Sequence, residues 1–314
     1  MVCAGGLLFG ALAAFAAVGC EGRELVLGLG RARNPPADVE DAGAGRDAGM
    51  LPGFPEYTEP NPIEAISSGD ASDDDPALSG DQLQLFFNSK RDGDSDHEDI
   101  WWARRAALAA DWGEPQPAAA LNTGQRETGI ALASSGLRIW FSSDRAGGKG
   151  GLDIYTASRA RGDDDWSEPE AVNELNSDGD DLVSSVSDSE LSLLMARRDD
   201  GDSDYDVFSA ERRELGAGWD EPRRLASIDS DADESDACYA AGKLLLIFTR
   251  DEDLYLAERP DRASEFRVAG EIARLNSDED DRDPWVADDL SLLLFSSKRS
   301  GSYKLYAAER LTQP

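Results

Sequence analysis

The residues with which this chain could do chemistry are mainly carboxylates. Its 314 residues include 64 Asp and Glu but 31 Lys and Arg, which gives a formal net charge of −33, and there is a single histidine, His97. One histidine leaves almost no room for His-based catalytic triads or His-rich metal sites. The negative field repels phosphate, and this argues against a nucleic-acid partner and against docking on an anionic membrane through a basic patch.

Three acidic runs, at 92–96, 200–204 and 229–233, alternate aspartate with other residues, as calcium-binding loops do. Oxygen ligands at positions i, i+2 and i+4 can converge on a hard cation. No run completes the EF-hand pattern, because each lacks its glycine at position six, so a solvated turn is the plainer interpretation. No cofactor other than calcium is expected, and its candidate ligands are Asp92, Asp94, Asp96, Asp200, Asp202 and Asp204.

A motif recurs five times at intervals of about fifty residues. It consists of Asp, an apolar residue and an aromatic residue, followed by Ala-x-Arg, and only the last copy has Lys304 in place of the Asp. The closing arginines are Arg105, Arg159, Arg212, Arg259 and Arg310. Repetition at a fixed period indicates a repeat architecture.

Each repeat offers four candidate strands. The apolar runs of five to seven residues are bounded by Gly and Asp clusters, which is typical of strands rather than helices. Short antiparallel strands repeated radially predict an all-β chain, a five-bladed β-propeller of four-stranded blades. A solenoid is the alternative, but its repeats are usually shorter. Six blades are the second choice, although no spare segment of fifty residues exists.

The phase of the repeat predicts how the ring closes. The segment 63–66, which follows Pro62, matches the fourth strand of a blade, and the chain ends soon after a third strand at 305–308. The N-terminal segment is therefore expected to complete the last blade and leave no exposed edge.

The tryptophans have two predicted roles. Trp112, Trp166 and Trp219 recur at one phase of the repeat, which indicates packing between blades. Trp101 and Trp102 are adjacent in a strand and must face opposite ways, so one of them is expected to leave the core and to be a binding candidate.

The repeat resembles a known family. The segment 141–148, Phe-Ser-Ser-Asp-Arg-Ala-Gly-Gly, followed by Asp153-Ile154-Tyr155, is similar to the PD40 or WD40-like repeat of TolB-type propellers. The resemblance covers about residues 62–310. It implies a TolB-like scaffold that binds envelope proteins.

The N-terminus predicts export. The uncharged apolar run at 4–18 is too short for a comfortable bilayer span and suits the core of a signal peptide. The segment 17–20, Ala-Val-Gly-Cys, resembles the lipobox of bacterial lipoproteins, which implies lipidation of Cys20; an ordinary secretory signal is the alternative. Residues 21–61 have the Gly, Ala, Pro and Asp content of a linker, which leaves 62–314 for the propeller.

Acidic residues also precede each predicted inner strand, where a propeller would gather them at one mouth of its channel. These candidate ligand-binding residues are Asp74, Glu127, Asp181, Glu234 and Asp281. Two carboxylates could serve as acid and base in glycoside hydrolysis. The acids recur with the repeat, however, as structural residues do, so we predict no catalysis.

The sequence as a whole predicts a monomeric, non-catalytic, protein-binding propeller in the cell envelope. A lipid anchor in the periplasm or outer membrane would be its only membrane contact, and secretion is the alternative. Its partner is expected to be an envelope protein or a glycan. A carbohydrate- or peptidoglycan-binding propeller, remotely a glycoside hydrolase, is the second hypothesis, and calcium-dependent adhesion is the third.

Overall fold

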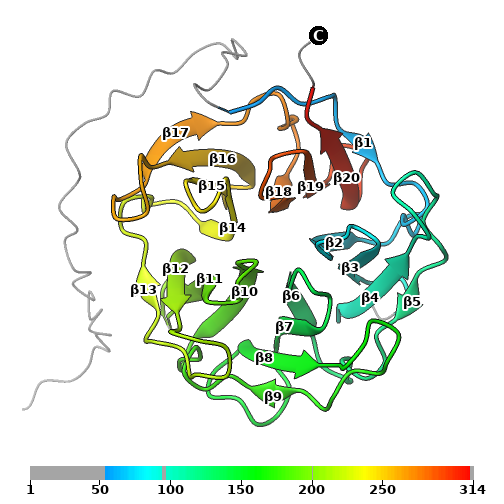
Figure 1. Ribbon diagram of the computed structural model, residues 1–314, viewed down its shortest axis with the longest axis horizontal. Helices are drawn as coiled ribbons and strands as arrows, with labels where there is room; N and C mark the ends of the chain where they lie inside the picture. Colours follow the sequence, from blue (N-terminus) through cyan, green and yellow to red (C-terminus); the bar gives the residue numbers. More distant parts are fainter. Residues whose placement is uncertain (1–53, 94–96, 200, 312–314) are drawn as a thin grey trace, which may run out of the picture. The chain divides into compact units, whose positions relative to one another are not determined.

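The described residues form a ring of five antiparallel sheets. The computed structural model describes residues 54–93, 97–199 and 201–311, all within the compact unit Arg46–Pro314. In those ranges the chain has twenty strands and no helix, and the sheets surround a common centre (Figure 1). It follows that none of these residues belongs to a helix long and apolar enough to cross a bilayer. The predicted five-bladed, all-β propeller is confirmed.

Each blade runs outward from the strand nearest the centre. Blade 1 is β2 (Asp73–Leu78), β3 (Gln84–Ser89), β4 (Asp99–Arg104) and β5 (Gln116–Pro117). Blade 2 is β6 (Glu127–Leu132), β7 (Arg138–Ser143), β8 (Asp153–Ser158) and β9 (Glu170–Ala171). Blade 3 is β10 (Asp180–Val186), β11 (Ser192–Arg198), β12 (Asp206–Glu211) and β13 (Arg223–Arg224). Blade 4 is β14 (Glu234–Ala240), β15 (Leu245–Arg250), β16 (Asp253–Glu258) and β17 (Arg267–Glu271). Blade 5 is β18 (Asp281–Val286), β19 (Leu292–Ser297), β20 (Lys304–Glu309) and β1 (Asn61–Pro62).

The N-terminal segment closes the ring, as predicted. β1 pairs with β20 through Asn61 and Ala307, and an isolated bridge joins Tyr57 to Arg310. The last blade therefore combines strands from both ends of the described chain, so β20 has no exposed edge.

The predicted position of the closing strand was wrong by a few residues. Residues 63–66 form the turn after β1, in which the amide of Ile66 donates to the carbonyl of Ile63 at 2.9 Å. The same turn follows β5, where Leu121 donates to Ala118 at 2.7 Å. Both Ile66 and Leu121 are fully buried, so their apolar character reflects burial in a turn rather than a strand.

Tyr57 gives a first test of this closure. Its hydroxyl is buried and donates to the carbonyl of Leu290 at 3.0 Å. Tyr57→Phe is expected to lower the free energy of unfolding by about 1 kcal/mol, because it removes one buried hydrogen bond and keeps the ring. Urea denaturation measures this change, and Leu311→Ala, at an exposed position, is the control expected to change stability by less than about 0.5 kcal/mol. Equal stabilities of Tyr57→Phe and the wild type would contradict the role of this bond.

Apolar side chains on both faces of each blade pack against the neighbouring blades. Trp101 packs on the core between blades 5 and 1, while Trp102 packs on the core between blades 1 and 2 and stacks on Phe86 at 6.2 Å. The expectation that one of the pair leaves the core was therefore wrong. The two side chains do face opposite ways, but a propeller blade is covered on both faces.

The recurring tryptophans pack between blades, as predicted. Each belongs to the edge of an apolar core and also lies under the guanidinium group of the arginine that closes its repeat. The ring-to-guanidinium distances are 4.6 Å for Trp112 and Arg105, 4.2 Å for Trp166 and Arg159, and 4.5 Å for Trp219 and Arg212. In blade 4, Phe266 takes the same place under Arg259 at 4.3 Å.

Candidate functional site

The recurring acids form one buried ion pair in every blade. The carboxylate near the start of each inner strand is almost fully buried and meets an arginine from the end of the second strand. The five pairs are Asp73–Arg91 at 2.6 Å, Glu127–Arg145 at 2.9 Å, Asp181–Arg197 at 2.6 Å, Glu234–Arg250 at 2.9 Å and Asp281–Arg299 at 2.6 Å.

Each of these arginines also holds the turn that enters its blade. In blade 2, Arg145 donates to Glu127 and to the carbonyl of Leu121 at 2.5 Å. The other four arginines bond the carbonyls of Ile66, Leu175, Ile228 and Leu275 in the same way. The pair thus fixes the connection between consecutive blades, which explains why it recurs.

Four of the five predicted ligand-binding acids belong to these pairs: Glu127, Asp181, Glu234 and Asp281. The fifth, Asp74, is one residue out of phase and pairs instead with Arg282 of blade 5 at 2.9 Å. Burial raises the pKa of Asp181 and of Glu234, against the opposing effect of their arginines. In the described ranges, neither cluster of acids that could share a cation contains more than one of the five. Their ligand-binding role stays a prediction.

The calcium prediction for the acidic loops also stays a prediction. Asp94, Asp96 and Asp200 lie outside the described residues, as does the lipidation candidate Cys20. Asp92 lies in the β3–β4 loop, and Asp202 and Asp204 lie in the β11–β12 loop.

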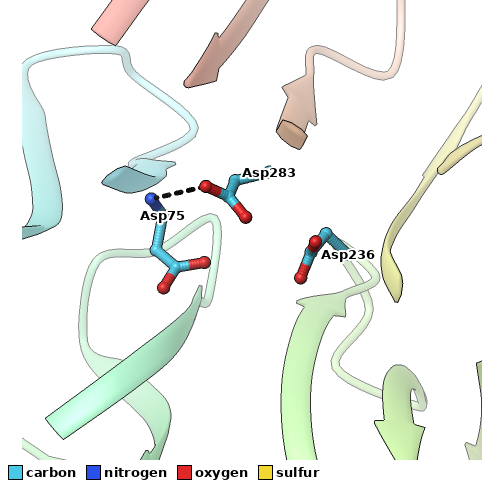
Figure 2. Close-up of side chains that lie close together, drawn as sticks. All are labelled: Asp75, Asp236 and Asp283. Atoms are coloured by element: carbon cyan, nitrogen blue, oxygen red, sulfur yellow. Dashed lines mark hydrogen bonds between the residues drawn. The ribbon is translucent and has the colours of Figure 1, made fainter. Parts of the chain in front are cut away.

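Three other aspartates, which the sequence did not single out, approach one another at the inner strands. Asp75 of β2, Asp236 of β14 and Asp283 of β18 each offer a carboxylate oxygen within 4.8 Å of the others (Figure 2). We call them the inner triad. Each stands two residues after the recurring acid, at a shift in the strand register, and has a positive φ of 47–55°. A bulge re-aims its side chain, and this brings the three carboxylates together.

The inner triad holds more negative charge than its surroundings neutralise. Asp75 accepts hydrogen bonds from the amide of Gly129 at 2.9 Å and the hydroxyl of Thr128 at 3.1 Å. Burial, followed by the charge of Asp283, raises the pKa of Asp75 to about 7. Burial, followed by the charges of Asp283 and Asp75, raises the pKa of Asp236 well above its usual value.

Arg282 is the cation beside this group. It lies 3.3 Å from Asp283 and also pairs with Asp74, whose pKa burial raises well above its usual range. A proton or a divalent cation shared by the carboxylates would relieve their repulsion.

A second acidic group surrounds an arginine. Asp206, Asp229 and Glu234 lie close enough to share a cation, but Arg224 already bridges Asp206 and Asp229. Burial and the hydrogen bond to Asp229 raise the pKa of Asp206 to about 6. Arg224 therefore already neutralises charge on two of these three carboxylates, and Arg250 pairs with the third.

A cavity of about 750 Å³ opens where the inner strands end. Residues of all five blades line it, among them Leu78, Leu132, Val186, Tyr239 and Val286. It also includes the turns that follow these strands, so it lies at the end of the ring away from the recurring ion pairs. No sequence pattern indicated this cavity, because its walls depend on how five separate turns pack.

Comparisons with known proteins show the fold alone. No family model and no curated protein sequence matches the chain. Among solved structures, the family 117 glycoside hydrolase Zg3597 of Zobellia galactanivorans is 9% identical with a TM-score of 0.50, and the match covers 82% of this chain and 91% of that one. A putative TolB from Agrobacterium tumefaciens is 16% identical with a TM-score of 0.47, covering 72% of this chain and 69% of that one. The catalytic domain of the Coprinopsis cinerea GH62 α-L-arabinofuranosidase is 12% identical with a TM-score of 0.49, covering 82% and 97%.

Proposed function

We propose that this protein is a non-catalytic binding propeller of the cell envelope, anchored through lipidated Cys20, which presents its loops to a protein partner. Loops held by a rigid scaffold are where binding surfaces are usually built. The strained inner strands and the buried ion pairs supply such a scaffold.

The observation that carries this proposal is the equivalence of the five blades. A glycosidase needs a carboxyl group that is free to give up or take a proton. Here every recurring carboxylate is bonded to an arginine, and the same arginine holds a backbone carbonyl in every blade. No blade departs from this pattern, so these acids have a structural role throughout the ring.

A cross-linked pull-down of the full chain from envelope extract tests the proposal, with and without calcium. We expect a specific protein that elutes with salt, since the acidic surface would attract a basic partner. Cleavage of a glycoside by the purified chain, lost in Asp75→Asn, would contradict it. Asp164→Asn, at a surface ion pair, is the control that should leave either result unchanged.

Glycan binding is the second candidate function, and the cavity favours it. Serine hydroxyls and aromatic side chains line a space of the size that small-molecule sites have, about 300–1,000 Å³. A binding propeller of this kind would also be non-catalytic.

A further inference from the structure

The cavity at the ends of the inner strands has a deep part and a solvent-facing rim. Ala77, Ile130, Ser184, Cys238 and Trp285 line it from the five inner strands, one from each blade. The rim includes the exposed side chains of the turns after these strands. A ligand could therefore enter from solvent and contact every blade.

Hydroxyl groups make up part of the polar lining, beside charged side chains at the rim. Five serines take part: Ser134, Ser184, Ser185, Ser187 and Ser189. The hydroxyl of Ser184 is buried and has no hydrogen-bond partner among the residues that the structure describes. A buried polar atom without a partner costs stability unless a ligand or water satisfies it. A serine hydroxyl can donate and accept at once, and so can the hydroxyl of a sugar.

The cationic side chains at the rim are already engaged. Lys243, Arg212 and Arg262 are the three lining residues with positive charge. Their partners are Glu211 at 3.3 Å, Glu190 at 3.4 Å and the carbonyl of Gly242 at 2.8 Å. Asp188 and Asp288 remain exposed at the rim. The field of the rim, in a chain of net charge −33, therefore disfavours anionic ligands.

The lining also offers apolar and aromatic surface. Trp285 and Tyr239 are half-buried aromatic residues of the lining, which also includes the aliphatic residues Leu132 and Val186. The C–H face of a sugar ring packs well on such side chains, while its hydroxyls need polar partners nearby. This combination suits a neutral sugar better than a purely apolar molecule.

We propose that this cavity binds a short neutral oligosaccharide. The assignment rests on the proposed non-catalytic binding role, within which it names a site and a ligand class. It does not depend on the protein partner.

Calorimetric titration of the full chain tests the assignment with cellotriose, xylotriose and triacetylchitotriose, and with trigalacturonate as the anionic probe. At least one neutral trisaccharide should bind and trigalacturonate should not. Ser184→Ala should weaken that binding about 2- to 10-fold, the effect of one hydrogen bond. Ser184→Leu should weaken it further, because the larger side chain takes up part of the cavity and cannot form a hydrogen bond.

Ser296→Ala is the matched control. Its hydroxyl is also fully buried and without a hydrogen-bond partner, but it lies on β19 and does not line the cavity. The assignment fails if no neutral trisaccharide binds, if trigalacturonate binds as tightly, or if Ser184→Leu binds like the wild type. None of these three results would contradict the protein-binding role that the pull-down tests. Cleavage of a bound trisaccharide, in contrast, would overturn the non-catalytic role as well.

Discussion

Arg145→Met is expected to lower the free energy of unfolding by about 3–5 kcal/mol, because it leaves a buried carboxylate without its cation. Glu127 is fully buried, and Arg145 lies 2.9 Å from it. The substitution also removes the hydrogen bond to the carbonyl of Leu121 that fixes the turn between blades 1 and 2. Urea denaturation at neutral pH measures the change.

Two further variants make this result specific. Arg161→Met breaks the ion pair with Asp164, but Arg161 is 83% exposed, so the expected loss is below about 0.5 kcal/mol. Combining Glu127→Gln with Arg145→Met should recover part of the loss, because no uncompensated charge then stays buried. A loss in Arg145→Met no greater than that in Arg161→Met would show that the recurring pairs do not hold the ring.

The architecture could be predicted because each repeat places the same residues in the same surroundings. In blades 1 to 4 an aromatic residue lies seven positions after the closing arginine and packs under it, as Trp166 and Arg159 illustrate. Every blade also has the buried ion pair of its inner strand, such as Glu127 with Arg145. Short apolar runs bounded by Gly and Asp indicate strands, and five copies indicate blades. Ring closure followed from the phase of the repeat alone.

The inner triad could not be located in this way. The run 73–75 contains three aspartates, and alternation by two places Asp73 and Asp75 on the same face of a regular strand. The bulge after Asp74 breaks that alternation, so Asp73 enters an ion pair while Asp75 meets Asp236 and Asp283. A comparison of repeats offers one signal: the position two residues after the recurring acid is Asp75, Gly129, Val183, Asp236 and Asp283 in the five blades.

The protein is expected to lose on the order of 2–3 kcal/mol of stability between pH 5 and pH 8 through the inner triad. Burial and Asp283 raise the pKa of Asp75 from 3.8 to about 7 in the folded chain. Between these values the folded state binds a proton that the unfolded state has released, so the free energy of unfolding falls as the pH rises. Carboxyl groups whose pKa is lowered, such as that of Asp180, change the stability only below this pH range.

Asp75→Asn should reduce this dependence, because the amide can still accept from Gly129 but cannot ionise. Asp206, whose pKa burial raises to about 6, keeps part of the slope in both proteins. The measurement is the urea midpoint of both proteins at several pH values from 5 to 8, with Asp164→Asn as the control that keeps the wild-type slope. Equal slopes for Asp75→Asn and the wild type would show that the triad does not titrate in this window.

Adding calcium distinguishes two ways of relieving the repulsion between the three carboxylates. A calcium ion held by the triad would raise the stability of the wild type at pH 8 and leave that of Asp75→Asn nearly unchanged. A proton shared by the carboxylates predicts no such difference, so the same titration decides which species neutralises the three carboxylates.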